Sequence, residues 1–362
     1  MLKHPKISLL RSSSKPYERR LPIHPEHLHL ISPGLRGYVY IESGYFKDFG
    51  YDDSYAKNLG FPVEPRSTLI TSADCHWIIR PMPEDLALMK HNTTVVGFFH
   101  CVQNQEMAKV AVHNKLTLVG MESLYNKYDE FLFVENSSIT GKQAVLHALA
   151  SANVTANNNL KAVVIGHGNV GYSAITELIN LGIVDITCCS KRDAVKILDK
   201  IKGIVYKKIK RSSDGLKVEI DDGSPILDIL KTADIIINAT AQHVYHPEIF
   251  LYNTDLKDLK GGALIIDISC DKNMGFEFAR INSLANPIIK LENVLYYAVD
   301  HLPTLDYDNA TKEMSNPLVR IFPIVVEYIN MLRKFEIIEN AIQIKNGGCI
   351  NPDIEYFKTH FC

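Results

Sequence analysis

Three glycines, at positions 166, 168 and 171, restrict the fold around them more tightly than any other feature of the chain. Residues 162–165 before them are apolar, like a buried strand, and residues 172–181 after them have the pattern of a helix that Gly182 ends. In such a strand–turn–helix unit the first glycine permits the tight turn, and the second lets another group approach the backbone. The free N–H groups at a helix start suit a pyrophosphate. The segment therefore predicts a dinucleotide-binding turn, although a glycine-rich turn without a ligand is the alternative; the predicted cofactor contacts are Gly166, Gly168, Asn169, Val170 and Gly171.

Short apolar runs alternate with helical patterns on both sides of this turn. The first 135 residues predict strands at 37–42, 77–79, 94–99 and 116–119, with helices at 56–59, 83–90 and 106–114 between them. A second series of strands is predicted at 160–165, 183–189, 235–238, 263–268 and 294–298. Strands alternating with helices are typical of parallel sheets that helices cover.

A helical pattern over residues 138–152, followed by turn-forming residues up to Asn159, predicts a domain boundary. A closing amphipathic helix is expected from Asn316 to about Ile344, returning to the first domain. We therefore expect an α/β protein with two doubly wound Rossmann-like domains and a cleft between them. The substrate domain would comprise residues 1–137 and 302–362, and the dinucleotide domain residues 138–301.

The composition of the chain is that of a globular protein, with 46% hydrophobic and 22% charged residues. A formal net charge of −2 argues against nucleic acid or an anionic membrane as a partner. The basic run 207–211 leads into Ser-Ser-Asp-Gly, which is typical of a solvated turn, so we expect no binding patch there. No apolar run reaches the length of a membrane span, and no secretory signal is expected. Seven scattered cysteines suggest neither a zinc site nor a disulfide framework, so we expect reduced thiols, no bound metal and a cytoplasmic location.

The strand after the glycine turn indicates which dinucleotide is used. An NAD site usually has Asp or Glu at the end of this strand, where the carboxylate binds the ribose hydroxyls. Here Asp185 lies at the start of the strand, and the strand ends in Ser190-Lys191-Arg192. A hydroxyl and two cations suit a 2′-phosphate. NADPH is therefore the expected cofactor and NAD remains possible; the alternative is that these three are ordinary surface residues.

Polar stretches end several other predicted strands, where ligands collect in open α/β sheets. They are residues 18–25, 79–85, 97–103, 266–271 and 298–304. The segment around Arg20, His-Cys-Val-Gln at 100–103, Asp-Ile-Ser-Cys-Asp at 267–271 and Val-Asp-His at 299–301 resemble the alanine dehydrogenase and saccharopine dehydrogenase superfamily. The resemblance extends from about residue 15 to 361 and is greatest to the N5-(carboxyethyl)ornithine synthase-like branch.

This resemblance implies a reaction and a role for each matching residue. Members of the superfamily reduce an imine formed between an amine and a 2-keto acid, or run the reverse oxidation. Arg20 would grip the keto-acid carboxylate, and His100 would be the catalytic acid/base. Asp271 would lie beside the nicotinamide and stabilise the developing iminium. Asp300 and His301 would lie near the cofactor ribose or nicotinamide. Alternatively, His301 is purely structural. A single histidine at a strand end, such as His100, is also more often structural when it is considered alone.

One residue departs from the family pattern. The family generally has lysine where this chain has Arg80. Arginine stays protonated in proteins, so Arg80 can bind a carboxylate but cannot transfer a proton. The resemblance then leaves His100 as the acid/base, and the choice of substrate is open.

The sequence thus predicts an NADPH-dependent enzyme acting on CH–NH bonds, which condenses an amino acid reductively with a 2-keto acid such as pyruvate. Its partners would be these two small molecules, and a homo-oligomer is possible. A saccharopine or alanine dehydrogenase-type enzyme that uses NAD is the second hypothesis. A nucleotide-binding regulator without catalysis is the third, supported by Arg80 alone and opposed by His100 and Asp271.

Overall fold

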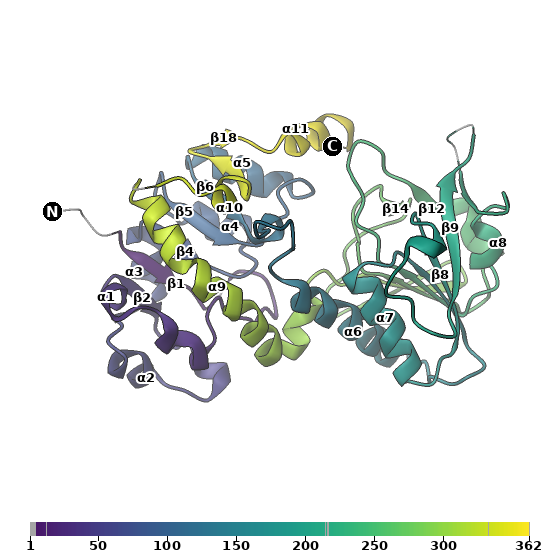
Figure 1. Cartoon of the computed structure of the whole chain (residues 1–362), viewed down its shortest axis with the longest axis horizontal. Coiled ribbons are helices and arrows are strands. Elements are labelled where there is room, and N and C mark those ends of the chain that lie inside the picture. The colour runs from purple at the N-terminus through teal and green to yellow at the C-terminus, as the bar shows by residue number, and fades with distance from the viewer. Residues whose placement is uncertain (1–4, 12, 214, 216, 332, 362) are drawn as a thin grey trace. The chain divides into compact units, whose positions relative to one another are not determined.

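The computed structural model describes residues 5–11, 13–213, 215, 217–331 and 333–361. Its chain forms two compact units, which we name unit 1 and unit 2 (Figure 1). Unit 1 comprises Met1–Asn136 and Asp306–His360, and unit 2 comprises Ser137–Leu305. Each unit is built on an eight-stranded, largely parallel sheet.

The sheet of unit 1 has the order β18-β17-β6-β5-β4-β1-β2-β3. Its first six strands along the chain run parallel to one another, whereas β17 pairs antiparallel with both β6 and β18. The parallel strands place all their carboxyl ends at one edge of the sheet. The strands of unit 1 are β1 (Ile7–Leu9), β2 (Val39–Glu42), β3 (Val63–Glu64), β4 (Cys75–Trp77), β5 (Thr94–Gly97), β6 (Thr117–Gly120), β17 (Ile342–Lys345) and β18 (Gly348–Cys349).

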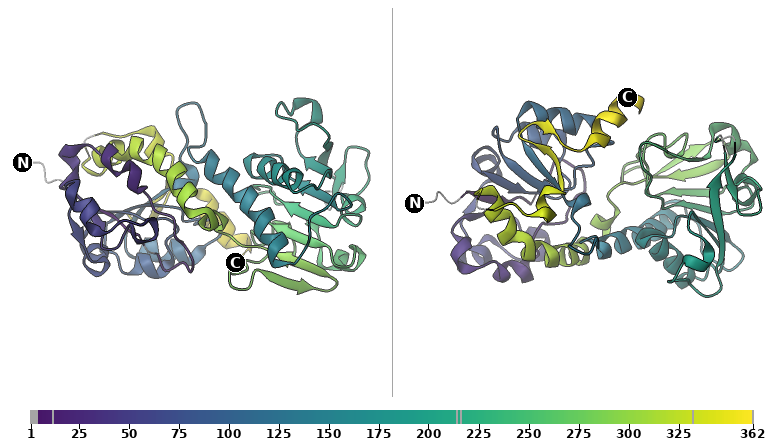
Figure 2. Two further views of the ribbon diagram at one scale, coloured as in Figure 1. Left: turned by 90° about the horizontal axis from the view of Figure 1, so that it is seen from below. Right: turned by 45° about the horizontal axis from the view of Figure 1, so that its top comes forward.

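Helices cover both faces of this sheet. Alternate residues of a strand point to opposite faces, and β5 accordingly sends Val96 to a core cluster with α9 (Tyr307–Ile329) and Val95 to a cluster with α5 (Gln105–His113). The long helix α9, yellow-green in Figures 1 and 2, thereby completes unit 1 from the C-terminal part of the chain. The remaining helices of the unit are α1 (Pro33–Arg36), α2 (Asp53–Asn58), α3 (Arg66–Ser72), α4 (Pro83–Ala87), α10 (Glu336–Glu339) and α11 (Pro352–Phe361).

Unit 2 has the order β10-β9-β8-β7-β11-β13-β16-β15. The six strands from β9 to β16 in this order are parallel, and β10 and β15 add antiparallel edges. Its strands are β7 (Lys161–Ile165), β8 (Asp185–Ser190), β9 (Val205–Arg211), β10 (Val218–Ile220), β11 (Ile235–Asn238), β13 (Leu264–Asp267), β15 (Ile288–Leu291) and β16 (Val294–Tyr297); β12 (Ile249–Leu251) and β14 (Gly275–Phe276) pair separately.

Two helices pack on one face of this sheet. Apolar residues of α6 (Val134–Ser151) and α7 (Asn169–Asn180) join Ala162 and Val164 of β7 in one core cluster. Val163 and Ile165 of the same strand point to the other face, into a cluster with α8 (Leu227–Leu230). The whole of unit 2 is thus organised around β7, the strand that leads into the glycine turn.

One sequence-based expectation is wrong in detail. The closing helix does not reach Ile344: α9 begins at Tyr307 and ends at Ile329, and Ile342–Lys345 is a strand. Ile342 and Ile344 pair with β6, whose open edge takes up their backbone groups. The basic run 207–211 lies in β9, which pairs with both β8 and β10.

No helix in the described part of the chain is both long enough and apolar enough to cross a membrane.

One buried histidine makes the stability of unit 1 depend on pH. His76 of β4 is inaccessible to solvent, and its Nδ1 lies 2.6 Å from Ser8 Oγ of β1. Burial, followed by the nearby charges of Arg66 and Lys90, lowers the pKa of His76 to about 3. Its folded-state pKa is below the unfolded value, so stability is complete above pH 6.5 and is lost as the pH falls towards 3.

We expect the unfolding free energy of unit 1 to fall by about 2 kcal/mol between pH 7 and pH 5 through this group alone. Trp77, the single tryptophan, is buried next to His76 and reports on unit 1 by fluorescence. Urea titrations of the His76→Gln variant should show a shallower pH dependence, and those of His29→Gln, at an exposed position, the wild-type dependence. Equal slopes for wild type and His76→Gln would contradict the assignment.

Candidate active site

The residues predicted to act in unit 1 follow the carboxyl ends of neighbouring strands. Arg20 lies in the segment after β1, Arg80 follows β4, and His100 follows β5. Strands β1, β4 and β5 are adjacent and parallel, so these segments leave the sheet at one edge.

Arg20 is held by a carboxylate that sequence reasoning did not single out. Glu18 Oε1 accepts from Arg20 Nε at 2.9 Å, and Glu18 Oε2 accepts from Nη2 at 2.6 Å. Arg20 Nη1 also donates to Asn136 Oδ1 at 3.2 Å. Both side chains of the Glu18–Arg20 pair are almost completely buried. Such a two-pronged pair fixes the plane of the guanidinium and therefore the direction of its remaining N–H groups.

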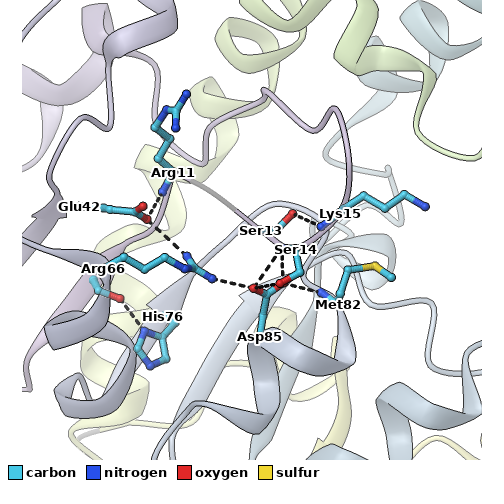
Figure 3. Close-up of polar contacts among 10 residues, drawn as sticks. Arg11, Ser13, Ser14, Lys15, Glu42, Arg66, His76, Met82 and Asp85 are labelled. Atoms are coloured by element: carbon cyan, nitrogen blue, oxygen red, sulfur yellow. Dashed lines mark hydrogen bonds and ion pairs between the residues drawn. The ribbon is translucent and has the colours of Figure 1, made fainter. Parts of the chain in front are cut away.

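Asp85 connects the segment that leads to Arg20 with the segment that carries Arg80 (Figure 3). Its carboxylate accepts from the Ser14 N–H at 2.8 Å, from Ser14 Oγ at 2.9 Å and from the Met82 N–H at 2.8 Å. Arg66 Nη2 donates to it as well, at 2.7 Å. The side chain is 1% exposed, so these bonds replace its hydration. Asp85 thus fixes both segments against the end of the sheet.

The side chain of His100 is exposed, while its backbone N–H is bound by a carboxylate of the neighbouring segment. Glu122, just after β6, accepts from the His100 N–H at 2.8 Å and from the Phe99 N–H at 3.2 Å. Desolvation raises the pKa of the Glu122 carboxyl, and these N–H donors and the positive charge of Arg80 oppose that shift. Glu122 therefore links the backbone of the proposed acid/base to Arg80 electrostatically.

Two of these residues have backbone angles that non-glycine residues rarely adopt. The φ angle is +50° at Arg80 and +49° at His100, and Cys270, within the Asp-Ile-Ser-Cys-Asp segment of unit 2, has +42°. Residues in this left-handed region cost free energy and cluster at functional sites. Each of the three positions lies three residues after the end of a strand, in a segment that carries predicted site residues.

In unit 2 the glycine turn has the geometry that a pyrophosphate requires. Gly168 is the N-cap of the 12-residue helix α7, and a Cβ built on it would meet no atom within 4 Å. By contrast, a Cβ on Gly171 would lie 2.1 Å from the Gly166 carbonyl oxygen. Gly166 itself has φ +105° and faces Ala239 across the turn. The outer side of the turn is open and its inner side is closed by backbone, so the residues fit a dinucleotide.

The three residues at the end of β8 already have partners within the protein. The Ser190 hydroxyl accepts from the Arg192 N–H at 3.2 Å, and an Arg192 Nη2–H bond to the His167 carbonyl connects this segment to the glycine turn. Lys191 Nζ lies 2.9 Å from Glu248 Oε2. Asp185 is exposed at the start of β8, as expected.

A buried carboxylate lies at the end of β13, four residues before the predicted Asp271. Asp267 accepts from Asn238 Nδ2 at 2.9 Å, from the Tyr296 hydroxyl at 2.9 Å and from the Cys270 N–H at 3.0 Å. These bonds hold the end of β13 against the ends of β11 and β16. Asp271 follows in the turn, where its carbonyl accepts from the Met274 N–H at 3.1 Å.

Asp267 should make unit 2 less stable as the pH rises. Burial raises its pKa to about 6, against the opposing effect of the three hydrogen bonds. The folded-state pKa is above the unfolded value, so its contribution is fully present below pH 4 and is lost as the pH rises through 6. Asp267→Asn removes the titrating group. We expect the unfolding free energy of the variant, relative to wild type, to rise by about 2 to 3 kcal/mol between pH 4 and pH 8.

Chemical denaturation followed by hydrogen exchange of the β7 and β13 amides measures this difference. The Asp185→Asn variant, at an exposed position on the same sheet, is the matched control and should follow wild type. A difference between wild type and Asp267→Asn that does not change with pH would show that the effect is packing, not charge.

Asp300 and His301, after β16, form a pair with each other. His301 Nδ1 lies 2.9 Å from Asp300 Oδ1, and both side chains are nearly buried. In the described residues, no group of three or more His, Cys, Asp or Glu side chains is arranged to hold a metal ion.

Comparison with known proteins relates both units to one family. The N-terminal domain of alanine dehydrogenase/PNT matches residues 10–156, and the C-terminal domain of alanine dehydrogenase/PNT matches residues 134–352. The chain belongs to this family. An N(5)-(carboxyethyl)ornithine synthase of Lactococcus lactis subsp. lactis is 23% identical over 327 residues, covering 86% of this chain and 93% of the relative. An alanine dehydrogenase of Bacillus subtilis (strain 168) is 23% identical over 318 residues, covering 83% and 81%.

The fold agrees with this membership. The solved structure of an L-alanine dehydrogenase superposes with a TM-score of 0.74 and 17% identity, covering 98% of this chain and 100% of that one. The predicted superfamily, the α/β class with Rossmann-like domains and a dehydrogenase-type enzyme are therefore confirmed. The roles of the individual site residues, the domain boundaries, NADPH as the cofactor and the cytoplasmic location stay predictions.

Sequence reasoning assigned no role to the carboxylates that support the site, although three of them lie in polar stretches that it identified. They are Glu18, Asp85, Glu122, Asp267 and Glu248. A local signal existed for one of them, because Asp85 stands third in a helix that begins with Pro83, where an acidic side chain reaches back to the backbone. Three of the others bind partners far away along the chain. Glu18 binds Arg20, two residues away, but the sequence does not show that the two side chains pair rather than face solvent.

Proposed function

We propose that this enzyme uses NADPH to condense an amino acid reductively with a short 2-keto acid such as pyruvate. The amine attacks the keto carbon, water leaves to give an imine, and hydride and a proton reduce the imine to a secondary amine. For pyruvate the balance is R–NH2 + CH3COCO2− + NADPH + H+ → R–NH–CH(CH3)CO2− + NADP+ + H2O.

The observation that carries this proposal is the exposed His100 on a left-handed backbone, anchored by Glu122, whose carboxylate also interacts with the positive charge of Arg80. An imidazole titrates near neutral pH, so it can protonate the departing carbinolamine oxygen and regain a proton afterwards. The family and its N(5)-(carboxyethyl)ornithine synthase members support the reaction class. A carboxyethyl group on nitrogen is what remains when the imine of an amine and pyruvate is reduced.

The two arginines of unit 1 serve as carboxylate ligands in this proposal. Glu18 fixes the Arg20 guanidinium in one plane, and Arg80 adds a permanent positive charge. Together they would hold the keto-acid carboxylate while His100 moves protons at the neighbouring carbon. Asp271 would stabilise the iminium, and Asp300 with His301 would lie near the cofactor.

The glycine turn would hold the pyrophosphate, and the dinucleotide supplies the hydride when bound. Ser190, Lys191 and Arg192 at the end of β8 support NADPH, because a hydroxyl and two cations suit a 2′-phosphate.

An NAD-dependent alanine or saccharopine dehydrogenase-type enzyme is the second candidate. Glu248 favours it, because this buried carboxylate neutralises Lys191 beside the end of β8.

A steady-state assay tests both candidates. Amino acids and ammonia are scanned against pyruvate and 2-oxoglutarate, each with NADPH and with NADH, and the product is identified by mass spectrometry. We expect NADPH consumption and an N-(carboxyalkyl) amino acid with at least one pair. Consumption of NADH with ammonia and pyruvate would favour the second candidate, and no consumption with any pair would contradict both.

A further inference from the structure

Two adjacent strands of unit 2 end beside a loop that carries an acidic residue. Strands β8 and β9 are parallel neighbours, with Ser190 opposite Lys208. Lys191, which follows β8, and Arg211, which ends β9, therefore leave the sheet at the same edge. The loop after β11, residues 239–248, reaches this edge and brings Glu248 to both cations.

Glu248 has two cationic partners but is nearly inaccessible to solvent. Its side chain is 8% exposed, with Oε2 2.9 Å from Lys191 Nζ and Oε1 3.6 Å from Arg211 Nε. Arg211 Nη2 also donates to the Pro247 carbonyl at 2.6 Å, which keeps the guanidinium close to Glu248. The carboxylate thus has a second partner of opposite charge if either one leaves.

The backbone of Glu248 is fixed by hydrogen bonds, whereas the side chain of Lys191 is exposed and can move. Gln242 binds the Glu248 backbone on both sides, accepting from its N–H at 2.5 Å and donating to its carbonyl at 3.0 Å. The Gly275 N–H donates to the same carbonyl at 2.9 Å. The side chain of Lys191 is 58% exposed and ends in a single ammonium on a flexible stem.

We propose that Glu248 is a specificity-determining residue, which holds Lys191 as an exchangeable counter-ion and thereby weakens the preference for dinucleotides with a 2′-phosphate over those without one. The inference rests on the proposed function in one respect, because it assumes that the adenosine ribose of the cofactor lies beside Ser190–Arg192. A 2′-phosphate competes with Glu248 for the Lys191 ammonium and is repelled by the carboxylate. When Lys191 turns to the phosphate, Arg211 remains with Glu248, so no buried charge is left unpaired.

Binding of nicotinamide-free probes tests this inference. Isothermal titration gives the Kd of adenosine 2′,5′-bisphosphate and of 5′-AMP for the full chain and its variants. Glu248→Gln keeps the shape of the side chain and removes its charge; we expect it to bind the bisphosphate more tightly by on the order of tenfold and 5′-AMP within about twofold of wild type. Lys191→Met should weaken bisphosphate binding by a similar factor.

The matched control is Asp222→Asn, which makes the same change in net charge on an exposed turn of unit 2. Its ratio of the two Kd values should equal that of wild type. Added NaCl should reduce the difference between Glu248→Gln and wild type, since the difference arises from charge.

Three outcomes would overturn the inference. In the first, Glu248→Gln leaves the ratio of the two Kd values unchanged. In the second, Asp222→Asn changes that ratio as much as Glu248→Gln does. In the third, Glu248→Gln loses 5′-AMP binding, which would make Glu248 a ribose ligand. These readouts contain neither amino acid nor keto acid. Failure of the inference is therefore distinct from failure of the proposed reaction, which appears only in the NADPH-consumption assay.

Discussion

The His100→Ala variant is expected to lose turnover by a factor on the order of 10² to 10⁴, the usual contribution of a general acid/base. Its affinity for NADPH should remain close to that of wild type, because the predicted nucleotide ligands all belong to unit 2. The stability of unit 1 should change little, since the His100 side chain is exposed. Single-turnover rates and fluorescence titration of NADPH measure the two effects separately.

A second substitution separates the imidazole from the backbone conformation. His100 has φ +49°, a region that asparagine tolerates better than alanine. His100→Asn therefore keeps the local backbone and removes the acid/base, and it should be as inactive as His100→Ala. His113→Ala, at an exposed position in α5, is the matched control and should retain wild-type turnover. Wild-type turnover in His100→Asn would exclude His100 as the acid/base and favour a regulator or a different proton donor.

The Gly171→Ala variant is expected to lose the folded structure of unit 2. The added Cβ would lie 2.1 Å from the Gly166 carbonyl oxygen and 2.9 Å from its carbonyl carbon, and neither backbone atom can move without breaking the turn. A destabilisation on the order of 5 kcal/mol is comparable with the whole stability of a domain. Far-UV circular dichroism and limited proteolysis should show unit 2 unfolded while Trp77 fluorescence reports a folded unit 1.

The neighbouring Gly168→Ala variant is the matched comparison. A Cβ there meets no atom within 4 Å and the backbone has φ −95°, so the fold should change by less than about 1 kcal/mol. The methyl group nevertheless occupies the open side of the turn, where a pyrophosphate would approach. NADPH affinity should fall at least on the order of tenfold, the effect of about 1.4 kcal/mol. Unchanged NADPH affinity in Gly168→Ala would contradict pyrophosphate binding at this turn.

The sequence was most informative where local pattern and local structure coincide. The glycine turn, β7 before it and α7 after it lie as predicted, because each depends on residues close together in the chain. Cys188 and Cys189 are buried in β8, within the strand predicted at 183–189. The end of the closing helix was wrong because Ile342 and Ile344 fit a helix and a strand equally well until the edge of β6 is available to pair with them.

The sequence by itself thus determined the dinucleotide turn, the two-sheet α/β class and the family. These features follow from spacing, alternation and short motifs. The tertiary structure alone decided what surrounds the predicted ligands: Glu122 beneath His100, Asp85 between two segments of unit 1, and Glu248 beside Lys191. Each of these carboxylates has a partner more than 20 positions away in the sequence, so its charge acts at a place that only the packing of strands creates. Gly166, Gly168 and Gly171 indicate a cofactor, and the fold brings the carboxylates close to the other predicted site residues at the neighbouring strand ends.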